Sequence, residues 1–296
     1  NFFRGDIKMY YYSIGDVGIK FNTNKKINSS TKFKLFQINK EKFDLLKNKV
    51  VFSIKNDKLP QINDCKKIGS GFEYFLQEEK NGTIRFLQKD EKEPYCCYIS
   101  YKNGQQEIRI EEKSEYLMSN IEDYFKAIDV VDIFCRHNAL ILHSSFINYK
   151  NAGIIFSGPS GIGKSTQADL WNKYEKTDII NGDRSLIKKS NHKWYAYGFP
   201  YSGSSNYCLN KVLEIKLIVI LEQGKQNNLV KLSNIEKFKY IYSQISVNKW
   251  DKYLNTKIID LVTDLVSNVS IIKLSCLPNE SAVKILKSFI EGENLI

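Results

Sequence analysis

The chain has 296 residues, of which 42% are hydrophobic, enough for one large domain or two ordinary ones. Its net charge of +11 favours acidic partners such as nucleotides or acidic peptides, but the excess is mostly lysine dispersed along the chain. No zinc-finger, zipper or RNA-recognition pattern accompanies the charge, so we expect no nucleic-acid partner. The longest apolar run is too short to span a bilayer, so we expect no membrane partner either.

Cysteine usage bears on the compartment. Six cysteines occur without C-x-x-C pairs or a disulfide-like spacing, and the chain has three histidines. This pattern favours a reduced, cytoplasmic protein without structural zinc. No signal peptide is recognisable at the first residues, which agrees with a cytoplasmic location.

Residues 1–115 are predicted to form a β-rich accessory or substrate-docking domain. Met9–Phe21 is rich in aromatic and β-branched residues, and Lys32–Ile38 alternates as a strand would. Nothing in this part of the sequence carries recognisable chemistry.

Two β-hairpins are expected within that domain. Asn81-Gly82 would join Phe72–Gln77 to Thr83–Leu87, and Asn103-Gly104 would join the next pair of strands. Asn-Gly between alternating runs favours the type I′ turn, whose twist matches that of the flanking strands.

A second domain is expected over residues 116–296. It would open with a linker helix at about 116–137, where apolar residues recur at helical spacing. Strands and helices then alternate. The predicted strands are Ala139–Ile147, Ala152–Phe156, Asp178–Ile180, Trp194–Tyr197 and Leu213–Leu221. The predicted helices are Ser165–Tyr174, Asn234–Val247, Tyr253–Asn268 and Asn279–Glu291.

A phosphate-binding loop is the most informative motif. Gly158–Ser165 reads Gly-Pro-Ser-Gly-Ile-Gly-Lys-Ser, a complete G-x-x-x-x-G-K-[ST] pattern between a predicted strand and a predicted helix. The glycines let backbone N–H groups converge on phosphate oxygens, and the helix N-terminus adds positive potential. Lys164 would reach the terminal phosphates, and the Ser165 hydroxyl would bind Mg²⁺. The residues expected to bind ATP are Gly158, Pro159, Ser160, Gly161, Ile162, Gly163, Lys164, Ser165 and Thr166.

A carboxylate follows the next predicted strand, within Asn181-Gly182-Asp183-Arg184. In open α/β sheets, ligands bind at the carboxyl ends of strands. Asp183 could therefore act as a general base towards an acceptor hydroxyl or as a ligand of Mg²⁺. The alternative is an aspartate that only closes a turn. The short interval from Lys164 to Asp183 is typical of kinases that bring a hydroxyl to the γ-phosphate.

Two further groups could complete the site. His143 ends or interrupts the strand that precedes the loop strand, and it could stabilise transferred phosphate or orient the base. A lone histidine in an apolar run is otherwise a core residue. The glycine- and hydroxyl-rich segment after Trp194–Tyr197 could cover the acceptor or be an ordinary turn. Its candidate acceptor-loop residues are Ser202, Gly203, Ser204 and Ser205.

Together these residues resemble the HPr kinase/phosphorylase family, whose catalytic domain is related to phosphoenolpyruvate carboxykinase. The similarity covers about residues 140–222. It rests on the His143 strand, the Gly158–Ser165 loop, the motif Asp183-x-x-x-Ile187 and the strand Leu217–Glu222. The resemblance implies a P-loop kinase domain of α/β or α+β class, with a mixed sheet flanked by helices.

The resemblance also implies roles for particular residues. Asp183 would accept the proton of a serine hydroxyl, Lys164 and His143 would be catalytic, and Ser165 would bind Mg²⁺. The chain departs from the family at Gly182-Asp183, where the family usually has Asp-Asp, and no acidic residue lies between Asp183 and Glu214. It is more similar to divergent HPr-kinase-like proteins, some of which phosphorylate serine on ribosomally made peptides.

We therefore expect an ATP- and Mg²⁺-dependent kinase that phosphorylates a serine hydroxyl of a peptide or small protein. A small-molecule or nucleoside kinase is an alternative, because such enzymes also place an aspartate soon after the loop helix. A nucleotide-gated binding module with little turnover is another. The β-rich first domain would suit recognition of an extended peptide by edge-strand addition. Typical members of the HPr kinase/phosphorylase family form hexamers. A homo-oligomer is therefore also open for this chain, although its sequence shows no assembly surface.

Overall fold

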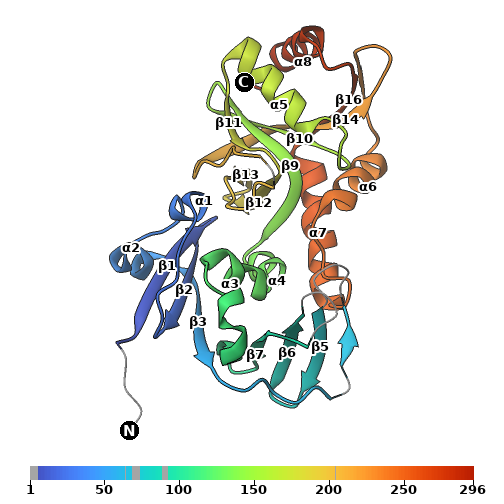
Figure 1. Cartoon of the computed structure of the whole chain (residues 1–296). Coiled ribbons are helices and arrows are strands. Elements are labelled where there is room, and N and C mark those ends of the chain that lie inside the picture. The colour runs from blue at the N-terminus through green and yellow to red at the C-terminus, as the bar shows by residue number, and fades with distance from the viewer. Residues whose placement is uncertain (1–5, 64, 69–73, 89–92, 204) are drawn as a thin grey trace. The chain divides into compact units, whose positions relative to one another are not determined.

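The computed structural model describes residues 6–63, 65–68, 74–88, 93–203 and 205–296. The chain divides into two compact units, Asn1–Ile133 and Phe134–Ile296. Each unit combines helices with a sheet that contains both parallel and antiparallel pairs, which confirms the mixed α and β class (Figure 1). Among the described residues, no helix has both the length and the apolarity needed to cross a bilayer.

The sheet of the first unit has the strand order β1-β2-β3-β8-β7-β6-β5-β4 over the described residues. Its strands are β1 (Lys8–Ile14), β2 (Val17–Thr23), β3 (Asn48–Asn56), β4 (Lys66–Lys67), β5 (Tyr74–Glu79), β6 (Gly82–Leu87), β7 (Cys96–Tyr101) and β8 (Gln106–Ile110). β3 pairs in parallel with both β2 and β8, and the other neighbours are antiparallel.

Both predicted hairpins are present. β5 pairs with β6 around Asn81-Gly82, and β7 pairs with β8 around Asn103-Gly104. The first predicted strand began at Phe72, which lies outside the described residues. Gly104 has φ +85°, a conformation that favours glycine, so the Asn-Gly signal has a direct structural reason at this turn.

The alternation over Lys32–Ile38 was a misleading strand signal. The structure has the short helix α1 (Thr31–Lys34) there, followed by α2 (Lys40–Leu45). The Ser30 hydroxyl caps α1 by accepting the backbone N–H of Phe33. Phe33 and Phe36 are both buried, and their spacing of three suits one face of a helical turn better than one face of a strand.

The single linker helix predicted at 116–137 is divided. A 3₁₀ turn (Glu112–Leu117) is followed by α3 (Ile121–Ala127) and α4 (Val130–Arg136). Ile128 between them is extended, with φ −80° and ψ 158°. The Asp129 carboxylate accepts the backbone N–H of Asp132 and so begins a second helix instead of continuing the first. The helical spacing of apolar residues does not reveal this break, because each of the two helices has an apolar face and the two patterns read as one in the sequence.

The second unit is built on strands β9 (Ala139–Tyr149), β10 (Ala152–Ser157), β11 (Asp178–Asn181), β12 (Arg184–Ser190), β13 (Lys193–Tyr197), β14 (Val212–Gln223), β15 (Asn228–Val230) and β16 (Ser270–Cys276). β9 and β14 are long, and each serves two parts of the sheet. The first half of β9 pairs with β12, and its second half pairs with β10 and β11. β14 pairs first with β13 and then with β10 and β16.

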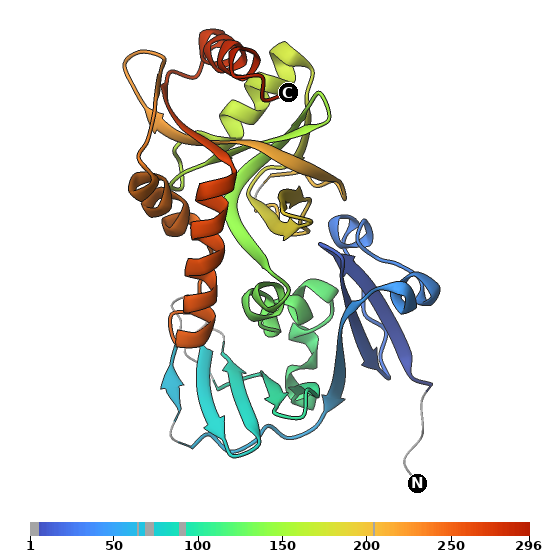
Figure 2. The same cartoon turned by 180° about the vertical axis from the view of Figure 1, so that it is seen from behind.

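The helices of this unit are α5 (Lys164–Glu175), α6 (Asn234–Gln244), α7 (Lys252–Asn268) and α8 (Glu280–Gly292), close to the predicted ranges. α5 and α8 lie side by side, as do α6 and α7 (Figures 1 and 2). Trp171 anchors α5: it is fully buried and meets the ring of Tyr149 edge-on at 5.0 Å between centroids. β10, β14 and β16 are parallel, so their carboxyl ends share the edge from which the loop into α5 departs.

Candidate active site

The glycine-rich loop connects β10 directly to α5. Gly161 and Gly163 have φ +77° and +111°, conformations that side chains rarely adopt. A Cβ at either position would meet no described atom within 4 Å, so the space beside both glycines is open. Gly163 caps α5 and has no side chain to accept the first N–H groups of the helix. Those N–H groups could bind an anion.

Lys164 is curled back onto this loop. Its Nζ donates to the carbonyl oxygens of Gly158 and Pro159, both at 2.9 Å, and the side chain is almost fully buried. Burial lowers the pKa of Lys164, and the negative charge of Asp183 acts in the opposite direction. The two carbonyl bonds hold the ammonium at the mouth of the loop, where a phosphate group could replace them.

Ser165 connects the loop helix to the predicted carboxylate turn. Its hydroxyl donates to the carbonyl oxygen of Gly182 at 3.2 Å. The buried Ser145 hydroxyl donates to the same oxygen at 3.0 Å. The start of α5 and the residue before Asp183 are therefore in direct contact.

His143 and Asp183 are brought together by strand register. Arg184 pairs with His143 across β12 and β9, and the His143 Nε2 lies 3.5 Å from Asp183 Oδ1. The Arg184 Nε lies 3.4 Å from the other carboxylate oxygen. Both His143 and Asp183 are about one-third exposed, so the pair is accessible from solvent.

The environment of His143 favours the neutral imidazole. Burial is the main reason that the pKa of His143 lies below its ordinary value, and the positive charge of Lys164 adds to the effect. Asp183 and a hydrogen bond with the Gln244 side chain oppose it. Gln244 is the last residue of α6, and Ile245 just beyond it bridges to Leu142 of β9. The end of α6 is thereby held beside the histidine.

Asn181 organises the turn that carries Asp183. It is fully buried, and its Oδ1 accepts the backbone N–H groups of Asp183 at 2.9 Å and Arg184 at 3.0 Å. Its Nδ2 donates to the carbonyl oxygens of Phe199 at 2.6 Å and Tyr201 at 3.4 Å. One amide side chain therefore fixes both the carboxylate turn and the beginning of the predicted acceptor loop.

The predicted acceptor loop lies against the same turn. A Cβ at Gly203, which has φ +55°, would lie 2.9 Å from Asp183 Cγ, so only a residue without a side chain fits there. The hydroxyl of Ser202 is buried and donates to the carbonyl oxygen of Ser205 at 3.0 Å, and the Ser205 Oγ accepts the N–H of Tyr207 at 3.1 Å. Ser204, also predicted for this loop, lies outside the described residues.

Gly182, where the HPr kinase/phosphorylase family usually has an aspartate, lies in a space too small for a side chain. A Cβ at this position would lie 2.1 Å from Ser205 Oγ and 2.6 Å from Ser205 Cβ. Ser205 occupies the place that a side chain at position 182 would need. A second aspartate could not be accommodated here without moving the loop.

The residues around Ser165 suit Mg²⁺ better than a metal that needs an all-protein site. Within the described ranges, no group of three or more His, Cys, Asp or Glu side chains could hold a metal ion. Mg²⁺ is typically held by one or two protein oxygens together with phosphates and water. The Ser165 hydroxyl and the Asp183 carboxylate, both among the described residues, could supply such oxygens.

The predicted Lys164, Ser165, His143 and Asp183 thus lie in one region of the second unit, with Gly203 against the carboxylate. Sequence reasoning missed Gln244, Ser145 and the bonding of Asn181. Their partners come from other elements, and a lone polar residue beside an apolar run is a weak signal. Ser145 does lie two residues after His143 in the Leu-His-Ser-Ser run, and two small hydroxyl residues inside a buried strand could have drawn attention.

Comparison with known proteins adds little to this geometry. No protein-family model and no curated protein matches the chain. Among solved structures, the chain is similar to the Hpr(Ser) kinase/phosphatase from Coxiella burnetii, with 13% sequence identity and a TM-score of 0.31 over 52% of this chain and 94% of that chain. A match at this level does not show a family, so the assignment depends on the chemistry of the site.

Proposed function

We propose that the protein is an ATP- and Mg²⁺-dependent kinase that transfers the γ-phosphate to a serine hydroxyl of a peptide or small protein. The observation that carries the proposal is the contact between the start of α5 and the Asp183 turn, through the Ser165 hydroxyl and the Gly182 carbonyl. Through this contact the start of α5 lies next to the turn that carries Asp183, and the space beside Gly161 and Gly163 of the loop is open. The resemblance of residues 140–222 to HPr kinases supports the same reaction.

Each side chain has a definite task in this reaction. The main-chain N–H groups of Gly161–Thr166 would bind the triphosphate oxygens, and Lys164 would exchange its two carbonyl bonds for the terminal phosphates. Mg²⁺, held by Ser165 and Asp183, would neutralise charge on the phosphates. The Asp183 side chain is 30% exposed, so a hydroxyl could approach its carboxylate.

The transfer itself needs one proton acceptor. The serine oxygen forms a bond to the γ-phosphorus while the bond to ADP breaks, and ADP leaves with the electron pair. The Asp183 carboxylate accepts the hydroxyl proton. His143, neutral near pH 7, lies 3.5 Å from Asp183 and can orient the carboxylate or donate to the transferred phosphoryl group.

The test is phosphorylation of peptides encoded by neighbouring genes, followed by mass spectrometry with the full chain, ATP and Mg²⁺. We expect a mass gain of one phosphoryl group on a serine, lost with Asp183→Asn. Asp178→Asn is the matched control, because Asp178 lies at the other end of β11 and pairs with Lys211 on the surface. Transfer that continues unchanged in Asp183→Asn would remove the proposed base.

The same assay separates the alternatives. ADP release with a panel of hydroxylated metabolites but with no peptide would identify a small-molecule or nucleoside kinase. Tight ATP binding without ADP release in the presence of any acceptor would identify a binding module.

A further inference from the structure

The sheet of the first unit leaves a place beside β3 where no strand lies. β3 pairs with β2 from Asn48 to Ser53, but it pairs with β8 only from Phe52 to Asn56, because β8 begins at Gln106. On the β8 side, the first part of β3 (Asn48–Val51) therefore has no strand beside it among the described residues.

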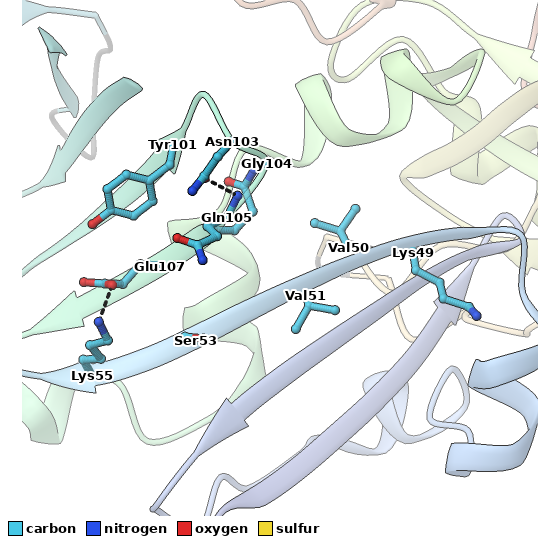
Figure 3. Close-up of a pocket in the computed structure, with 11 residues that line it drawn as sticks. Lys49, Val50, Val51, Ser53, Lys55, Tyr101, Asn103, Gly104, Gln105 and Glu107 are labelled. Carbon is cyan, nitrogen blue, oxygen red and sulfur yellow. Dashed lines mark hydrogen bonds and ion pairs between the residues drawn. The ribbon is translucent and has the colours of Figure 1, made fainter. Parts of the chain in front are cut away.

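A pocket of about 570 Å³ opens at this place (Figure 3). Residues of β3 form one side, and the tip of the β7–β8 hairpin, from Tyr101 to Glu107, forms the other. The tip is closed by its own bonds: Gly104 N–H to the Tyr101 carbonyl at 2.9 Å, Tyr101 N–H to the Gln105 carbonyl at 2.9 Å, and Gln105 N–H to the Asn103 side chain at 3.0 Å. The tip thus satisfies these backbone groups within itself, and the pocket lies between it and β3.

The backbone of β3 is what the pocket offers to a ligand. In a sheet, successive residues direct their N–H and C=O groups alternately to the two neighbouring strands. Half of the residues in Asn48–Val51 therefore direct these groups into the pocket, in line with the ladder that continues at Phe52 and Gln106. Such a row is a template for an added strand. Val51, 41% exposed, provides an apolar contact beside it.

The charges around the pocket favour an acidic ligand. Lys49, Lys55 and Glu107 are the charged residues that line it. The Glu107 carboxylate is already paired with Lys55 at 2.6 Å and with Arg109. The Lys49 ammonium donates to the Asp44 carbonyl oxygen, which leaves further N–H donors. The uncompensated charge at the pocket is thus positive.

We infer that this pocket binds an extended, acidic segment of the peptide acceptor, which adds as a strand beside β3. The inference rests on the proposed function for the identity of the peptide as acceptor. The docking segment and the phosphorylated serine would be separate stretches of one peptide. Binding at β3 would then raise the local concentration of the serine without any contact near Asp183.

The experiment uses the full chain and a library of peptides that contain one serine and a randomised segment of acidic and neutral residues. Binding is measured without nucleotide, and the tightest peptide is labelled for fluorescence anisotropy. Lys49→Glu and Val51→Glu should each raise its Kd by about tenfold or more, because each places a negative charge against an acidic strand. Lys47→Glu, an exposed residue just before β3, is the charge-matched control and should leave the Kd unchanged.

A second measurement needs no protein variant. Methylation of the backbone nitrogens at alternate residues of the peptide removes the donors of one edge only. One set of methylated positions should abolish binding and the other should be tolerated, as strand addition requires. No bound peptide, equal effects of both sets, or a Kd unchanged in both pocket variants would overturn the docking site.

A phosphorylation assay distinguishes failure of the docking-site proposal from failure of the kinase proposal. With the selected peptide, the pocket variants should raise KM and leave kcat unchanged, since Asp183 and the loop are untouched. Binding with no phosphate transfer would contradict the kinase and leave the docking site standing. Transfer with an unchanged KM would contradict the docking site alone.

Discussion

The Nε2 of His143 lies 3.5 Å from Oδ1 of Asp183, and the two residues reach this position from β9 and from the turn that follows β11. The pair matters because Lys164 is close enough to influence both groups electrostatically. The three side chains therefore influence one another electrostatically, and a substitution of one should change the properties of the others.

The first prediction concerns the pKa of His143. It should lie below 6.5, mainly because of burial, and Lys164→Met should raise it, because the positive charge of Lys164 is the second cause of the lowering. Nitrogen-detected NMR titration can measure this directly. The chain has three histidines, so the resonance lost in His143→Gln identifies the group. A His143 pKa at or above 6.5 in the native chain would contradict the burial argument.

The same shift sets a pH dependence of stability. Between the lowered pKa of the folded protein and 6.5, the unfolded chain binds a proton that folded His143 does not, so stability falls as pH decreases through this window. Above pH 6.5 the contribution vanishes. In urea unfolding, the stability of the native chain minus that of His143→Gln should therefore be constant above pH 6.5 and should decrease as the pH falls below it.

A second prediction tests Lys164. Lys164→Met should reduce phosphate transfer by at least about a hundredfold, since phosphate-clamping groups act mainly by stabilising charge in the transition state. Lys173→Met, on the exposed side of the same helix, is the control and should retain full transfer. Calorimetric titration with ATP separates lost binding from lost chemistry. Equal transfer by both variants would remove Lys164 from the mechanism.

A third prediction concerns Asn181. Asn181→Ala removes the acceptor of two part-buried N–H groups and a donor to two carbonyls, and should destabilise the protein by about 2–4 kcal/mol. It should also lower kcat at temperatures where the variant is still folded, because Asp183 and the acceptor loop lose their common support. Asn172→Ala, which removes one bond at the far end of α5, should reduce stability but not kcat. Loss of stability with normal kcat would limit Asn181 to a structural role.

A fourth prediction exploits the contact between Gly182 and Ser205. Gly182→Ala should cost about 1–3 kcal/mol and impair transfer, because its Cβ collides with the Ser205 side chain. Adding Ser205→Gly removes the colliding atoms and should restore most of both losses. A double-mutant cycle of unfolding free energies measures the coupling. Additive effects would show that Ser205 does not fill the space beside Gly182.

Local signals in the sequence were sufficient for much of this molecule. The pattern Gly158–Ser165 between an apolar run and a helical one predicted the strand, turn and helix, because glycine conformations and the helix start are set by neighbouring residues. Both Asn-Gly hairpins followed for the same reason. α1 was missed because Phe33 and Leu35 alternate with Lys32 and Lys34 in the sequence, whereas the residues that the turn buries, Phe33 and Phe36, are three apart.

Long-range contacts account for what could not be predicted. Gln244 meets His143 only because the end of α6 bridges to β9, and no residue near either one signals this. Asn181 was recognised as part of a turn, but its bonds to Phe199 and Tyr201 depend on how a later loop returns to the sheet. The vacant place beside β3 arises from the register of two strands, which composition does not encode.

The carbonyl oxygen of Gly182 accepts two hydroxyl hydrogens, one from Ser165 and one from Ser145. If Ser165 rotates towards a metal ion, the oxygen is not orphaned, since Ser145 remains bonded to it within the sheet. The rotation then breaks one hydrogen bond but leaves no buried carbonyl oxygen without a donor. Its free-energy cost is therefore small, and the rotation is readily reversible. Ser145 would thus keep the Gly182 carbonyl hydrogen-bonded while the Ser165 hydroxyl leaves it and returns in each catalytic cycle.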